Sequence, residues 1–100
     1  MRRIARADEN QAEIVAALKS IGASVAQCHA VGEGFPDLCV GWRGHTYLLE
    51  IKNPKKPKSD RQLTPRQVEW HNEWRGHVDV VETVKDALAA IGIPFKGTIS

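Results

Sequence analysis

The stretch PDLCVGWRGHTYLLEIKN, residues 36–53, decides the fold of this chain. Two runs rich in Leu, Val, Trp and Tyr lie on either side of the dipeptide Arg43–Gly44. Apolar runs joined by a two-residue turn that contains glycine are typical of a β-hairpin. The pattern therefore predicts two antiparallel strands, over residues 37–42 and 45–52.

The tight turn of the predicted hairpin also determines which residues face each other. Counting outward from Arg43–Gly44, Asp37 lies opposite Glu50. Directly opposed side chains have Cβ atoms about 4.5–5.5 Å apart, and like charges there are destabilising. A hard divalent cation with oxygen ligands would compensate for this repulsion. A bulge or a longer loop would shift the register.

Strand alternation places Glu50 and Lys52 on one face, whereas Tyr47, Leu49 and Ile51 point to the other face and can build the core. Two carboxylates with an ammonium group close by suit the hydrolysis of a phosphodiester bond. The acids would hold Mg²⁺, which polarises the phosphate and lowers the pKa of a bound water. Lys52 would orient or help to deprotonate that water, or offset charge in the transition state.

Taken one at a time, these residues have structural interpretations that involve no chemistry. Asp37 could be a loop acid at the start of a strand. Glu50 and Lys52 could lie on a solvated sheet face. Their combination in the predicted hairpin is what favours a catalytic site.

The rest of the chain predicts helices and short strands around the hairpin. Helical spacing, N-cap residues and terminating glycines predict three helices, which begin at the caps Asp8, Thr64 and Thr83 and end before Gly22, Gly76 and Gly92. Strands are expected over 24–29 and 77–82, and segment 53–63 is expected to be a loop. The resulting order, α-β-β-β-α-β-α, predicts an α/β fold with a central mixed sheet flanked by helices.

Length and composition are typical of one globular domain. The chain has 100 residues, of which 42% are hydrophobic and 26% charged. We expect a core over about residues 8–91, a peripheral tail over 92–100, and a core small enough to make a homodimer plausible. There is no membrane-spanning run, no apolar signal-peptide region and no disulfide framework, so we expect a cytoplasmic protein.

Positive charge is concentrated after the hairpin, although the formal net charge is only +2. Such a local basic patch predicts contacts with the phosphates of DNA, which position the backbone without reading sequence. The alternative is a solvated loop. The basic residues concerned are Lys55, Lys56, Lys58, Arg61 and Arg66, and Arg2, Arg3 and Arg6 could add to them.

The residues also resemble a known family. Pro36-Asp37 followed by Glu50-Ile51-Lys52 is similar to the PD-(D/E)XK nuclease signature. The wider pattern resembles the virus-type replication-repair nuclease (VRR-NUC) branch of that superfamily, in a stand-alone phage-type form. It includes a first-helix glutamate, Glu13, and the segment LTPRQVEWH with Gln67, and it covers about residues 8–90. The resemblance implies a restriction-endonuclease-like core.

The resemblance also implies a site and a substrate. The metal would be Mg²⁺, with Mn²⁺ as a substitute and no small-molecule cofactor, and Glu13 would complete the site from the side or through water. Family members of this kind are typically homodimers that cut four-way junctions in the manner of a Holliday-junction resolvase. The alternatives are a flap or nicking repair nuclease and a non-catalytic DNA-binding module. The implied site residues are Asp37, Glu50 and the backbone carbonyl of Ile51 as ligands, with Lys52, Glu13 and Gln67 beside them.

Three helical residues have competing interpretations. Glu13 could be a solvated flank of its helix. Gln67 ends the capping-box pattern that starts at Thr64, so its amide could simply cap the helix. His71, one turn after Gln67, is predicted to be a surface histidine, with a phosphate contact as the alternative.

Overall fold

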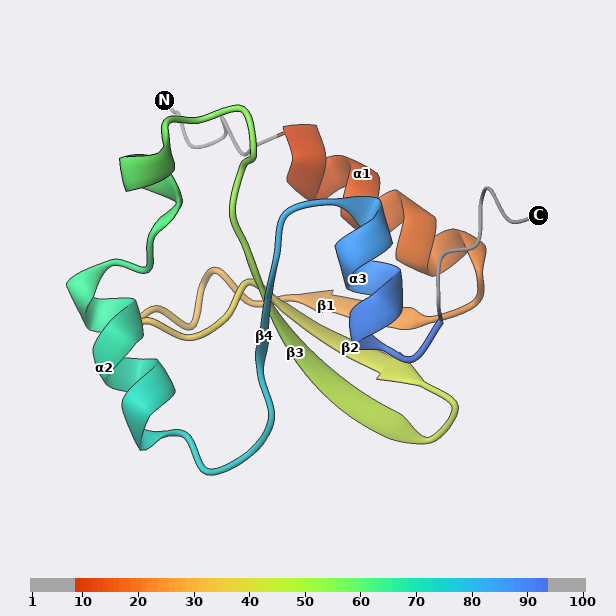
Figure 1. The fold of residues 1–100 in the computed structure, drawn as a ribbon. Helices are drawn as coiled ribbons and strands as arrows, with labels where there is room; N and C mark the ends of the chain where they lie inside the picture. Colours follow the sequence, from red (N-terminus) through yellow and green to blue (C-terminus); the bar gives the residue numbers. More distant parts are fainter. Residues whose placement is uncertain (1–8, 94–100) are drawn as a thin grey trace.

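A four-stranded sheet lies at the centre of residues 9–93, the part of the chain that the computed structural model describes (Figure 1). The α/β class and the predicted order are confirmed. The short 3-10 helix η2 is an addition, inside the segment predicted to be a loop. In chain order the elements are α1 (Glu9–Ser20), β1 (Ser24–Gln27), β2 (Leu38–Trp42), β3 (His45–Ile51), η2 (Lys58–Arg61), α2 (Pro65–Glu73), β4 (Asp79–Val81) and α3 (Val84–Ala90).

The sheet is mixed, as predicted. Its strand order is β1-β2-β3-β4, with β1–β2 and β2–β3 antiparallel and β3–β4 parallel. The parallel pair requires a crossover, and the chain from β3 to β4 supplies it through η2 and α2. This crossover brings α2 back beside the strand that carries Glu50.

The two edge strands are shorter than their sequence patterns predict. β1 ends at Gln27 and β4 covers only Asp79–Val81, because each pairs with a single neighbour and its ends lack ladder hydrogen bonds on the other side. α2 ends at Glu73, before the predicted stop at Gly76. The predicted cap Asp8 and the arginines at 2, 3 and 6 lie outside the described residues.

The hairpin has the predicted register. Trp42 pairs with His45 and Leu38 pairs with Leu49. Arg43 and Gly44 both have positive φ, 52° and 82°, as a two-residue hairpin turn with the twist of the flanking strands requires. No bulge interrupts this ladder between Leu38 and Trp42, so the open end of the hairpin is fixed by the turn.

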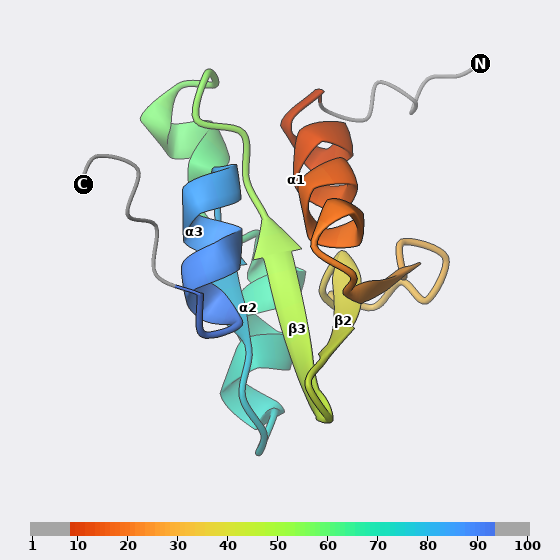
Figure 2. The ribbon, with the colours of Figure 1, turned by 90° about the vertical axis from the view of Figure 1, so that its right-hand side faces the viewer.

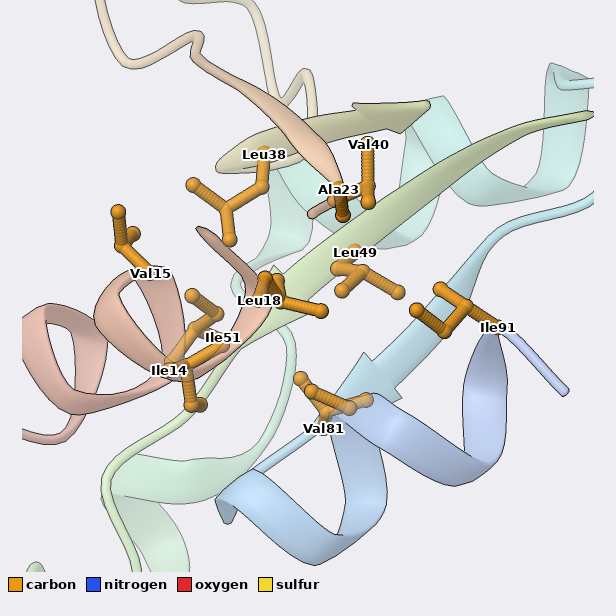
Figure 3. Close-up of a cluster of buried hydrophobic side chains, with 11 residues drawn as sticks. Ile14, Val15, Leu18, Ala23, Leu38, Val40, Leu49, Ile51, Val81 and Ile91 are labelled. Carbon is orange, nitrogen blue, oxygen red and sulfur yellow. The ribbon is translucent and has the colours of Figure 1, made fainter. Parts of the chain in front are cut away.

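The core lies on one face of the sheet. Helices α1 and α3 cover that face and α2 lies behind the opposite one (Figure 2). In Figure 3, Ile14 and Leu18 of α1 point toward Ile51 and Leu49 of β3. The cluster consists of Ile14, Val15, Leu18, Ala23, Leu38, Val40, Leu49, Ile51, Val81, Ala87 and Ile91.

The opposite face receives the alternate side chains of β3. Because Leu49 and Ile51 are buried in the core, Glu50 points toward α2. α2 itself contains no buried residue. It therefore adds little to the apolar core and instead brings polar side chains to the end of β3. Within residues 9–93, no helix has the length and apolar character needed to cross a membrane.

The core position of Leu18 gives a stability prediction. Its side chain is fully buried in the cluster between α1 and β3. Leu18→Ala should lower the free energy of unfolding by about 2–5 kcal/mol, because it removes buried methyl groups and leaves a cavity. Urea unfolding measures this loss. Val80→Ala is the control: Val80 is 46% exposed, so the expected change is within about 0.5 kcal/mol. Equal losses would contradict the assignment of the core.

Candidate active site

Asp37 and Glu50 meet at the open end of the β2–β3 hairpin. Asp37 immediately precedes β2, and its Oδ2 accepts the backbone N–H of Ile51 at 2.8 Å. Glu50 is only 1% exposed, and it is the one buried charged residue among residues 9–93. The negative charge of the Asp37 carboxylate acts on the Glu50 carboxyl. The predicted opposition of the two acids is thus present in the fold.

The surroundings of Glu50 disfavour its ionised form. Burial is the main cause and the negative charge of Asp37 is the second, and together they raise the pKa of Glu50 to about 8. Lys52 and Gln67 act in the opposite direction. Glu50 therefore retains its proton near neutral pH.

The donor atoms of this pair suit a hard divalent cation. Oε2 of Glu50 accepts a hydrogen bond from Gln67, but Oε1 is buried without a partner in the described part of the chain. A buried carboxylate oxygen without a partner is costly unless a cation or a donor occupies the space before it. Oxygen ligands and unbalanced negative charge are what Mg²⁺ requires. The oxygen atoms of the acid pair therefore fit a divalent metal, and the Ile51 carbonyl stays a predicted further ligand.

Lys52 is held next to the acids by both its backbone and its side chain. Its backbone N–H donates to Val81 in β4 at 2.9 Å, and its carbonyl accepts from the Asn10 amide in α1 at 2.9 Å. Its Nζ donates to Oε1 of Gln67 at 2.8 Å and lies 3.8 Å from Oε2 of Glu50. The side chain is 11% exposed. The ammonium group is thus fixed beside the acid pair.

Gln67 combines the two roles that its position in the sequence left open. It forms the capping box of α2 with Thr64: its backbone N–H donates to Oγ1 at 3.2 Å and its Oε1 accepts the Thr64 N–H at 2.9 Å. The same amide accepts from Lys52 and donates to Glu50, each at 2.8 Å. One side chain therefore caps the helix and joins the lysine to the buried acid.

Glu13 lies on α1. Its exposed side chain lines a cleft between α1 and the start of α3, with Glu9, Asn53 and Glu82 nearby. Within the described ranges, no group of three or more acids, histidines or cysteines is arranged to hold a metal. The structure therefore does not bring Glu13 into one group with Asp37 and Glu50. A ligand role for Glu13, direct or through water, stays a prediction.

The basic residues predicted to bind DNA fall into two groups. Arg66 forms an ion pair with Glu33, and NH1 of Arg61 lies 3.6 Å from Glu82. The second group is Lys55, Lys56 and Lys58, which are exposed in the segment between β3 and η2. Of these, Lys55 lies 3.9 Å from Glu9, with both side chains more than four-fifths exposed. Such a solvated pair is weak, so the lysines carry the available positive charge.

His71, predicted to be a surface histidine, is half-buried on α2. Its Nε2 is buried and has no hydrogen-bond partner among the described residues. Burial and, second, the positive charge of Lys52 lower the pKa of His71. The signal in the sequence was the spacing from Gln67, which places both side chains on one face of α2. That spacing could not reveal that this face turns toward the acid pair.

Comparisons with known proteins support the fold. No protein-family model and no curated protein matches this sequence. Among solved structures, one described as "VRR_NUC domain" is similar, with a TM-score of 0.59 and 24% sequence identity over 81% of this chain and 88% of that chain. The chain therefore has the mixed-sheet α/β fold of a VRR-NUC domain. The fold that the sequence resemblance implied is confirmed.

The raised pKa of Glu50 predicts how stability depends on pH. The native state binds a proton at Glu50 up to about pH 8, whereas an unfolded glutamate releases it near its ordinary pKa of 4.5. Stability from this group is therefore complete below pH 4.5 and is lost as the pH rises toward 8. Glu50→Gln cannot titrate, so the variant should gain stability relative to the wild type over this range.

Urea midpoints at a series of pH values, without divalent cations, measure this difference. Glu73→Gln is the matched control, since Glu73 is exposed on α2. Its curve should run parallel to that of the wild type. A parallel curve for Glu50→Gln as well would show that Glu50 titrates normally in the folded protein.

Proposed function

We propose that this chain is a divalent-metal-dependent nuclease of the PD-(D/E)XK type that hydrolyses phosphodiester bonds in DNA. The observation that carries the proposal is an acid pair in which buried Glu50 has an unpartnered oxygen, next to a lysine held by an amide. The likeness in fold to a VRR-NUC domain supports it. Structural acids that only stabilise a fold are normally paired or solvated, and among the described residues Glu50 Oε1 is neither.

Each residue of the site has a distinct part in this proposal. Asp37, Glu50 and the Ile51 carbonyl hold the metal, with Glu13 as a further ligand from the side. When bound, Mg²⁺ or Mn²⁺ polarises the phosphate and lowers the pKa of a water. Lys52 orients the attacking water or offsets negative charge that develops on the phosphate.

Gln67 holds these side chains in position. Its amide oxygen fixes the Lys52 ammonium and its amide nitrogen fixes Oε2 of Glu50. Glu50 Oε1 is thereby left to face a cation. A side chain that orients both a ligand and a neighbouring charge should affect activity about 10–100-fold when it is replaced.

The finer proposal is that the enzyme cuts branched DNA, in particular four-way junctions, as a homodimer inside the cell. A two-fold dimer would offer two sites to two strands of a pseudo-symmetric junction. The loop lysines and Arg61 and Arg66 would contact phosphates around the branch. The competing proposals are a flap or nicking nuclease, which would cut a different form of DNA, and a DNA-binding module without catalysis.

Cleavage of end-labelled DNA tests the proposal. A four-way junction, a flap and a linear duplex of matched sequence are each incubated with Mg²⁺, Mn²⁺ or EDTA. The wild type should cut the junction with either metal and not in EDTA. Asp37→Asn and Glu50→Gln should lose more than about 100-fold in rate, and Gln67→Leu about 10–100-fold.

Glu73→Gln again serves as the control and should cut at the wild-type rate. Preferential cutting of flaps would support the nuclease proposal but show that the substrate is a flap and not a four-way junction. Salt-sensitive binding without cleavage under either metal would favour the binding module and refute the enzyme.

The exposed lysines generate a separate prediction about binding. A triple variant with Lys55, Lys56 and Lys58 changed to Ala should bind DNA more weakly. The slope of log K against log salt concentration should fall in magnitude by up to about 0.9 for each phosphate that the variant no longer neutralises. Fluorescence anisotropy in EDTA at several salt concentrations gives this slope. Lys19→Ala, on the exposed end of α1, should leave it unchanged, and an unchanged slope in the triple variant would remove the loop from the interface.

A further inference from the structure

His71 carries a buried polar atom that the proposed mechanism does not use. Its Nε2 is shielded from solvent and no group in the described part of the chain bonds to it. The other ring nitrogen is not among the buried unpartnered atoms, so water can satisfy it. An unpaired buried nitrogen carries a cost that most native structures avoid. Its persistence at this place indicates that a partner reaches it in the working protein.

Lys52 brings a hydrogen-bond donor to the same face of α2, through its contact with Gln67. His71 lies one turn after Gln67 on α2, and the Lys52 charge acts on its ring. An ammonium group has three N–H donors. Oε1 of Gln67 accepts one at 2.8 Å, and Oε2 of Glu50, at 3.8 Å, is too distant for a hydrogen bond. Among the described residues, Lys52 therefore retains donors without an acceptor.

The His71 ring is in the right protonation state to accept a hydrogen bond. Burial and the nearby ammonium both lower the pKa of His71 and so favour neutral imidazole, and a neutral ring has one nitrogen with a free lone pair. Solvent contact at Nδ1 suits the N–H tautomer there, which leaves Nε2 as the acceptor. The Trp70 ring meets the His71 ring edge-on, with centroids 5.5 Å apart, and restricts its rotation.

We propose that His71 is a positioning residue for Lys52, whose ammonium donates a hydrogen bond to Nε2 when the site is loaded. The proposal rests on the nuclease function. Oε2 of Glu50 is too distant to accept a hydrogen bond from Lys52, and a cation on the acid pair would engage that carboxylate instead. Two neutral acceptors on one helix face, Gln67 Oε1 and His71 Nε2, would then hold the ammonium toward the phosphate.

Imidazole nitrogen NMR tests the contact without requiring any cleavage. Spectra of ¹⁵N-histidine-labelled protein at pH 7 with Mg²⁺ should show His71 unprotonated at Nε2. Lys52→Met should shift that resonance and leave the signal of the exposed His45 unchanged. A proton on Nε2, or a resonance that does not respond to Lys52→Met, would overturn the proposal whether or not the protein cuts DNA.

Kinetics test the consequence, on the DNA form that the wild type cuts fastest. His71→Phe should lower kcat about tenfold, since it removes a hydrogen bond to a charged group, and should leave KM unchanged. His71→Gln, whose side-chain oxygen can accept near the position of Nε2, should recover most of the loss. His45→Phe on the hairpin is the control.

Wild-type kcat in His71→Phe, or an equal loss in His71→Gln, would assign His71 to packing alone. If the proposed nuclease function is wrong, the wild type itself will cut no DNA. The NMR spectra would still show whether Lys52 contacts His71.

Discussion

The structure depends on two carboxyl groups that share the open end of one hairpin. Asp37 and Glu50 are brought together by a register that the Arg43–Gly44 turn fixes. Burial of Glu50 and, second, the negative charge of Asp37 raise the pKa of Glu50 to about 8. Their neighbours reduce this cost only in part, through the Ile51 N–H and the Gln67 amide. A cation would complete the compensation, so the imbalance that destabilises the acid pair is also the basis of the proposed metal site.

Helix α2 reaches the acid pair without contributing to the core. It buries no residue fully, and its attachment relies on the Gln67 amide and on the loop before β2. In that loop, Phe35 packs edge-on against Trp70 with ring centroids 5.4 Å apart. Gly34 has φ of +82°, and a Cβ there would lie 2.6 Å from the Arg66 carbonyl oxygen. Only glycine allows this approach, so the loop fixes the helix that carries the polar face of the site.

Charge is distributed unevenly around this site. Arg61 and Arg66 are each paired with an acid that lies far away in the sequence, Glu82 and Glu33. Such pairs connect the η2 and α2 segments to the rest of the fold, and they leave the lysines of the preceding loop as the exposed positive charge. The paired arginines thus connect elements of the fold, whereas the loop lysines remain exposed to solvent.

The sequence by itself determined the local features: the hairpin, its register and the α2 capping box. Each depends on residues close together in the chain, where turn geometry and strand or helix periodicity leave few choices. It also determined that Glu50 and Lys52 share a face. Only the tertiary structure decided that Gln67 bonds both of them, that His71 Nε2 is buried and that Glu13 lines a cleft between α1 and α3. Periodicity identifies the face of an element on which a side chain lies. It cannot identify what that face meets, because the packing of distant elements sets those partners.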